Sequence, residues 1–182
     1  GVRVTEGEIV GGFNGGWPIV EATLEKASVA LGAEMIGGAQ AVVDMALQYA
    51  KERTQFGRPI GSFQSIQHYF ADMWADILGS RDLLYRAAWK ISEDLPAGAD
   101  VAMARARAGR TFRRVTTLGH QIFGAVGFTE EHDMHLYHRR SIAMDLAWGG
   151  AEDRCRRIAE GLFGEAWGGA PGTDAVPRGD LK

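Results

Sequence analysis

The segment YAKERTQFGRPIGSFQ, residues 49–64, determines how this chain folds. A long run with apolar residues at every third or fourth position leads into it. Gly57, Pro59 and Gly61 then interrupt this helical pattern. A second run with the same period begins directly after Ser62. The segment therefore predicts a turn that joins two antiparallel helices.

Four side chains of the turn have chemistry suited to a ligand, namely Arg53, Phe56, Arg58 and Gln64. Two guanidinium groups, an aromatic ring and a carboxamide beside the amides of a helix end suit a phosphorylated aromatic cofactor. The same arginines could instead neutralise the carbonyl groups at the C-terminal end of the first helix. Local chemistry leaves both interpretations open.

The remaining sequence predicts further helices, separated by glycine- and proline-rich breaks. The expected helices run from Pro18 to about Arg53, from Phe63 to about Ser92, from about Asp100 to Phe123, from the N-cap Thr129 to about Met144, and from Ala151 to Phe163. We therefore expect an all-α fold, an up-and-down four-helix bundle with a short fifth helix. Gly37 and Gly38 lie in the middle of the first helix, where glycine costs stability. Close approach of another helix or of a ligand would explain them.

Composition limits the classes of function. The 182 residues are 46% hydrophobic and 24% charged, with a formal net charge of −3, which disfavours binding to nucleic acid or to an anionic membrane. Cys155 stands alone, which excludes an intrachain disulfide and fits a reducing compartment. No uninterrupted apolar run approaches the length of a membrane span. We expect a cytoplasmic protein.

The chain divides into three parts. In residues 1–16, the alternation in Val2–Val4 and Glu8–Val10 resembles remnants of strands before a glycine-rich break. Residues 17–164 carry the helical pattern, and residues 165–182 are rich in glycine and proline. We expect the first part to be the remnant of a preceding β-domain or a linker, and the last to be an extended or poorly ordered tail.

Three stretches in register carry a resemblance to a known family. They are R-x-x-F-G-x-x-I-x-x-F-Q at residues 53–64, AEMIGGAQAVVDMALQYAKER at residues 33–53 and GHQIFGAVGFTEEHDMHLYHRR at residues 119–140. Over residues 17–163 the chain resembles the C-terminal helical domain of the acyl-CoA dehydrogenase family. The resemblance implies α,β-dehydrogenation of an acyl-CoA thioester with FAD as cofactor. It also implies that an N-terminal helical domain and a β-domain precede this point, that this piece alone is inactive, and that the subunits form homo-oligomers, as dimers or tetramers.

The resemblance assigns cofactor contacts to the turn. It implies that Arg53 and Gln64 approach the pyrophosphate and adenosine part of FAD, and that Phe56 packs against the cofactor.

The resemblance assigns a second set of contacts to a loop of the form Q-x-x-G-G-x-G, which faces the cofactor from across the dimer. Gln121, Gly124 and Gly127 match this loop, whereas Ala125 replaces its second glycine. If that position needs a positive φ or very close backbone approach, alanine costs affinity.

The family's reaction also needs a carboxylate base. The positions at which family members carry it align with Trp148–Gly149 and with Ala27, and neither holds a carboxylate. Glu25 is expected to point elsewhere on the helix. Glu34 lies one heptad after Ala27 on nearly the same face, so it is the candidate base. An ion pair between Glu34 and an arginine of the third helix is the alternative.

The arginines of the third helix and the histidines are expected to have structural roles. The five arginines of the third helix go round more than one of its faces, so we expect most of them to be solvated or at a contact with another subunit: Arg105, Arg107, Arg110, Arg113 and Arg114. His132, His135 and His138 diverge on a helix, so we expect surface or subunit-contact histidines and no metal site. His120 could reach the cofactor loop or form hydrogen bonds in the core.

Three functions follow from these observations. The first is the C-terminal domain of an FAD-dependent acyl-CoA dehydrogenase that contributes FAD contacts and an oligomer interface. The second is a subunit without its own base, which clamps the cofactor in a hetero-oligomer with a homologous catalytic subunit. The third, an unrelated helical interaction module, requires all three motif matches to be coincidental.

Overall fold

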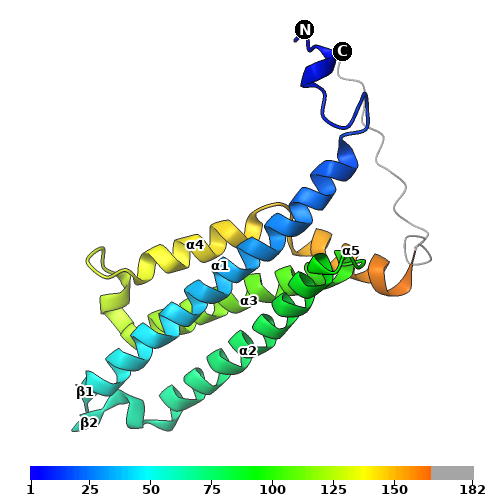
Figure 1. The fold of residues 1–182 in the computed structure, drawn as a ribbon. Helices are drawn as coiled ribbons and strands as arrows, with labels where there is room; N and C mark the ends of the chain where they lie inside the picture. The colour runs from blue at the N-terminus through cyan, green and yellow to red at the C-terminus, as the bar shows by residue number, and fades with distance from the viewer. Residues whose placement is uncertain (165–182) are drawn as a thin grey trace, which may run out of the picture.

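The computed structural model describes residues 1–164, in which five α-helices pack around an apolar core (Figure 1). The helices are α1 (Trp17–Glu52), α2 (Gln64–Ser92), α3 (Gly98–Phe123), α4 (Met134–Leu146) and α5 (Ala151–Phe163). The first four run up and down, and α5 packs against α3 at one end of the bundle. The predicted all-α bundle with a short fifth helix is confirmed.

Helix α3 is the centre of the bundle because its small residues allow α1 and α2 to approach closely. Ala104 and Ala108 are buried, and the ring of Phe112 packs into the space that Gly38 leaves on α1. A Cβ atom on Gly38 would lie 2.6 Å from Cζ of Phe112, so internal packing explains this glycine. A Cβ on Gly37 would have no neighbour within 4 Å among the described residues.

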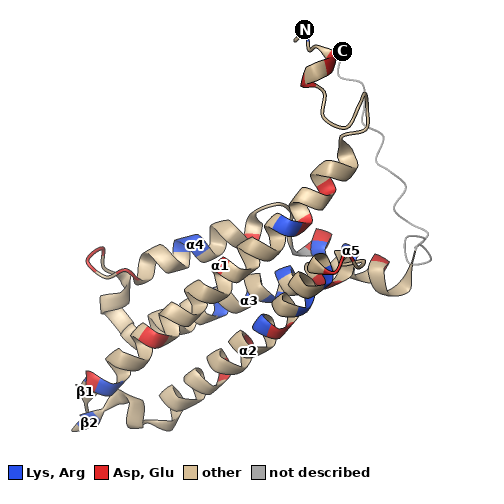
Figure 2. Ribbon diagram, viewed as in Figure 1, with Lys and Arg blue, Asp and Glu red and all other residues tan. Residues whose placement is uncertain are grey.

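Ion pairs join α2 to α3, and the charged residues along both helices are coloured in Figure 2. Asp76 on α2 is buried and accepts ion pairs from Arg107 at 2.6 Å and Arg114 at 2.8 Å. Arg105 is itself buried, with 4% of its surface exposed. Most of the α3 arginines were expected to be solvated or at a subunit contact; Arg105 is the exception, because it lies inside the domain.

Several sequence expectations need correction. Residues 1–16 contain a short 3-10 helix (Glu6–Glu8) and no strand. That they are the remnant of a β-domain or a linker stays a prediction. The fourth helix begins at Met134 rather than after Thr129, because the Thr129 hydroxyl donates back to the Val126 carbonyl. The predicted tail, residues 165–182, lies outside the described residues.

Helix α1 is long and largely apolar. By length and composition its 36 residues could cross a membrane, with a mean hydropathy of 1.2 over the most apolar window. This criterion allows charged residues within the window, so the expectation that no uninterrupted apolar run reaches the length of a membrane span is not contradicted. In this fold, Met35, Val42 and Ala46 of α1 are fully buried in the core against other helices. A central position in the bundle accounts for the apolar composition of α1.

Candidate functional site

The turn between α1 and α2 is a small β-hairpin. Its strands are β1 (Thr54–Gln55) and β2 (Arg58–Pro59), with Thr54 opposite Pro59. The two residues at its tip, Phe56 and Gly57, have positive φ angles of 52° and 79°. This conformation matches the two-residue turns that suit the twist of a hairpin, and it is uncommon for an aromatic residue. The hairpin therefore holds the Phe56 ring in a fixed outward position.

The side chains of the hairpin form an accessible surface. Phe56 is 92% exposed and its ring lies 6.2 Å from that of Phe63, edge to face. The Arg58 guanidinium stacks 4.1 Å from the centre of the Phe63 ring. Gln64 is the exposed first residue of α2, and no side chain caps that helix, so its first amides face outward. Together with the exposed Arg53 at the end of α1, these groups form an anion- and ring-binding surface.

The second predicted contact region lies at the same end of the bundle. The ring of Tyr49, on the last turns of α1, lies 4.9 Å from that of Phe123 at the end of α3. Exposed Gln121 lies on the last turn of α3, which leads into the 3-10 helix η3 (Gly124–Phe128). The structure thus brings both predicted cofactor regions to one end.

Gly124 and Ala125 differ in their backbone requirements. Gly124 has φ 63° and ψ −140°, a combination that is essentially restricted to glycine. Ala125 is not among the residues with positive φ. The replacement of glycine by alanine therefore introduces no backbone strain at position 125.

A cluster of histidines lies against η3. His120 is 6% exposed, and its ring stacks on that of Phe128 at 4.4 Å and meets that of His138 at 5.1 Å. His132 packs 4.3 Å from Phe123. His132, His135 and His138 are half-buried, and the rings of His132 and His138 contact other rings of the domain. The expectation of surface or subunit-contact histidines stays a prediction. Among residues 1–164, no group of three potential ligands could hold a metal ion.

The other end of the bundle contains Ala27 and Trp148–Gly149, the positions to which the resemblance assigns a catalytic base. A small cavity of about 60 Å³ is lined there by residues of α1, α3, α5 and the α4–α5 loop, among them Ser28, Trp148 and Glu25. Glu25, expected to point elsewhere, thus lies on this cavity. Its Oε1 would be 3.2 Å from a Cβ on Gly98, so it lies beside the N-terminus of α3. The positive end of that helix stabilises a carboxylate charge.

Two buried guanidinium groups hold the α4–α5 loop. Arg105 donates to the carbonyls of Met144 and, at 3.3 Å, of Ala147. Arg154 on α5 donates to the Gly149 carbonyl at 3.0 Å and to the Asp145 carbonyl at 2.8 Å, and it pairs with the Asp145 carboxylate at 2.7 Å.

These contacts have an electrostatic cost and a conformational effect. Burial lowers the pKa of Arg105 to about 10; Arg154 acts in the same direction and Asp145 in the opposite one. Arg105 therefore stays protonated at neutral pH. Trp148, between the clamped carbonyls, has φ 54°, which is unusual for a non-glycine residue. The clamp holds the Trp148 backbone in this conformation.

Glu34 lies neither on the hairpin surface nor on the small cavity. Its carboxylate accepts two hydrogen bonds from Arg140 on α4, at 2.7 and 3.1 Å, and its side chain is 52% exposed. The alternative of an ion pair is thus the observed one, although the partner belongs to α4 and not to the third helix. The idea of a base on a buried helix face does not fit this exposed position.

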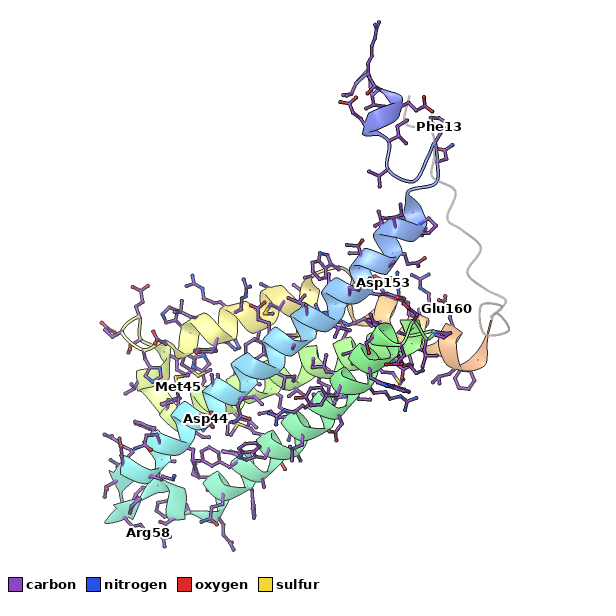
Figure 3. All side chains as sticks on the ribbon, viewed as in Figure 1. Phe13, Asp44, Met45, Arg58, Asp153 and Glu160 are labelled. Carbon is purple, nitrogen blue, oxygen red and sulfur yellow. The ribbon has the colours of Figure 1, made fainter. Side chains whose placement is uncertain are left out.

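The two candidate surfaces lie far apart along the bundle. In Figure 3, Arg58 marks the hairpin end and Asp153, which lines the small cavity, marks the other. Ala27 and Arg53 are 26 positions apart in the sequence (53 − 27), almost all of them within the single helix α1, which corresponds to about 39 Å.

Comparison with known proteins identifies this architecture. Residues 14–163 match the family model described as "Acyl-CoA dehydrogenase, C-terminal domain". The chain belongs to the acyl-CoA dehydrogenase family. A short-chain-specific acyl-CoA dehydrogenase from Megasphaera elsdenii is 37% identical over 76% of this chain, which spans 36% of that relative. This domain therefore corresponds to much less than half of such a protein.

Solved structures agree with this assignment. The FAD complex of PigA superposes with a TM-score of 0.80 at 28% identity, covering 85% of this chain and 40% of that one. The ChsE4–ChsE5 complex from Mycobacterium tuberculosis superposes with a TM-score of 0.73 at 35% identity, covering 79% and 39% of the respective chains.

Sequence inspection missed the loop clamp, although one signal was present. Val101, Arg105, Ala108 and Phe112 are spaced by four, three and four residues, so they form one helical stripe. The other three members of this stripe are apolar, which places Arg105 on the core face of α3. Arg154 gave no such signal, because it lies in the largely charged segment Glu152–Arg157.

Proposed function

We propose that the full-length protein is a subunit of an FAD-dependent acyl-CoA dehydrogenase assembly, in which this domain supplies cofactor contacts but no catalytic base. The proposal rests on which residues occupy the candidate base positions. Ala27, Trp148 and Gly149 have no carboxylate, and the Glu34 carboxylate is held by Arg140. A partner subunit with a homologous fold would then supply the base.

The residues at the hairpin end fit FAD. Arg53 and the uncapped amides of α2 suit a pyrophosphate, Gln64 offers hydrogen bonds, and Phe56 presents a free ring face to an aromatic group. When bound, FAD accepts the hydride that leaves the β-carbon of the acyl group. The chain's own task at this end is to bind and orient the cofactor.

An assembly of subunits follows from the length of the domain. The hairpin surface and the cavity beside Trp148 are about 39 Å apart along α1, at opposite ends of the bundle. One chain therefore serves two different flavins from its two ends, and each flavin lies between subunits. The ChsE4–ChsE5 structure is a complex of two different proteins, and this supports the proposal of a mixed assembly.

A second candidate is an acyl-CoA dehydrogenase that carries its own base in this domain, at Glu25. One observation favours it: Glu25 lines the same cavity as Trp148 and makes no ion pair among residues 1–164. Against it stands the position of the carboxylate, since its Oε1 lies beside Gly98 at the N-terminus of α3, which offers a local partner for its charge.

The test uses the full-length protein, alone and co-purified with a homologous subunit, under anaerobic conditions with acyl-CoA. Glu34→Gln and Glu25→Gln are each expected to leave flavin reduction in the mixed assembly within about twofold of wild type. Arg53→Ala is expected to lower FAD retention, and Arg139→Ala, an exposed arginine of α4, serves as the control. Loss of reduction in Glu25→Gln or Glu34→Gln, with flavin still bound, would show that this domain carries the base.

A further inference from the structure

Four of the five histidines of this chain gather around η3, the loop that carries Gly124 and Ala125. His120 is the central one. Its ring stacks on Phe128 of η3 and meets His138 of α4, while His132 and His135 also act on it electrostatically. The fifth histidine, His68, is exposed on α2.

The η3 backbone rests directly on the imidazole of His120. A Cβ on Gly127 would lie 3.2 Å from Nδ1 of His120 and 3.0 Å from Cβ of Phe123, so glycine at this position allows the close approach. The Phe128 ring, itself 71% exposed, covers one face of the imidazole at an interplanar angle of 18°. The position of the loop thus depends on the His120 side chain.

The surroundings of His120 favour a neutral ring. Its buried Nδ1 makes no hydrogen bond of normal geometry with any residue that the structure describes. Protonation would place a charge and a second N–H donor in this site. The face of the Phe128 ring attracts a cation, but three further imidazoles that become charged in acid oppose it.

The groups near the cluster come from three segments. On α4 and the segment before it, the titratable groups are His132, His135, Tyr137 and His138, with Glu130, Glu131 and Asp133 exposed to solvent; on α1, Tyr49 packs against Phe123. The residues shown to act on His120 are the three histidines, all of which disfavour its protonation, and the Gly127 backbone, which favours it.

We propose that His120 is a positioning residue for the loop Gly124–Phe128: its neutral imidazole supports the loop, and protonation releases it. The inference rests on the proposed function in one respect, because this loop and Gln121 form one of the surfaces assigned to FAD. Acidic pH would then weaken the binding of FAD by this domain.

The direction and size of the effect follow from linkage. Burial, followed by the charges of His138 and His132, lowers the pKa of His120 in the folded loop below the ordinary value of about 6.5. The open loop therefore binds more protons than the closed one. The closed loop has its full stability above about pH 6.5 and loses it as the pH falls through that value. The open fraction therefore rises as the pH falls from 7.5 to 5.5, by at most about tenfold for an open-state pKa of about 6.5.

The test measures amide hydrogen exchange of residues 124–129 in the full-length protein at both pH values, corrected for intrinsic exchange rates. Wild type and the matched control His68→Gln are expected to show the same increase in opening, of up to about tenfold. His120→Phe keeps a stacked ring without a proton and should abolish the pH dependence. His120→Gln, which is polar and does not titrate, should do the same if the phenylalanine variant folds poorly. An unchanged pH dependence in either variant, or none in wild type, would overturn the proposal.

FAD retention, measured on the same samples, separates the two proposals. Retention that falls with loop opening in wild type, but not in His120→Phe, supports both. Loop opening that depends on His120 without any change in FAD retention supports the positioning role and refutes the assignment of this loop to the cofactor.

Discussion

The adjacent glycines of α1 offer a matched test of the packing between α1 and α3. Gly37→Ala and Gly38→Ala make the same chemical change, one residue apart in one helix. Each should gain about 0.8–1.0 kcal/mol from helix propensity. The methyl group at position 37 meets open space, whereas that at position 38 would lie 2.6 Å from Cζ of Phe112, whose buried ring cannot move away freely. Overpacking of this kind costs about 1–3 kcal/mol.

The difference between the two variants isolates the packing term, because the propensity gain cancels. Gly37→Ala should be more stable than Gly38→Ala by about 1–3 kcal/mol, or about 6 °C in Tm for a difference of 2 kcal/mol. The assay is urea and thermal unfolding of the 182-residue chain, followed by far-UV circular dichroism. Equal stabilities of the two variants would refute the close contact between Gly38 and Phe112.

Two further predictions concern the loops. Arg105→Met leaves the carbonyls of Met144 and Ala147 without their buried donor, so it should lower the free energy of unfolding in urea by about 2 kcal/mol. The control Arg107→Met removes a partly exposed ion pair and should lower it by less than about 1 kcal/mol. Gly124→Ala places a Cβ on a backbone conformation that is essentially restricted to glycine, at a cost of about 1–3 kcal/mol. FAD retention in the full-length protein should therefore fall about tenfold. The control Ala125→Gly should change FAD retention less than twofold.

Sequence periodicity predicted most of the fold because apolar spacing directly reports which face of a helix is buried. The bounds of α1, α3 and α5 agree with the prediction within two residues. The start of α4 does not, because hydrogen bonds compete locally there. At Thr129 the hydroxyl prefers the Val126 carbonyl to the N-terminus of α4, and no pattern distinguishes a cap from such a turn. The β-hairpin was also beyond prediction, since its strands have two residues each.

The candidate site was predicted less completely, because side-chain direction depends on neighbours that are distant in sequence. The hairpin residues were placed correctly at one end, since the turn itself fixes them. Glu34 and Glu25 were misjudged, because their surroundings depend on Arg140, 106 residues away, and on the N-terminus of α3. Helical phase alone could not reveal either neighbour.

The α4–α5 loop bears most directly on whether this domain performs chemistry. Two buried guanidinium groups and a left-handed Trp148 are each unfavourable in isolation, so the carbonyl contacts must outweigh their cost. This arrangement fixes the backbone at the position where a base would be needed, yet the side chain there cannot accept a proton. In the proposed assembly, this clamped backbone under an indole is suited to forming a wall for a bound acyl group, whereas proton transfer would require a carboxylate at the same place. The rigidity of the loop and the chemistry of its side chain therefore both favour a binding role for this end of the domain, with the base supplied from elsewhere in the assembly.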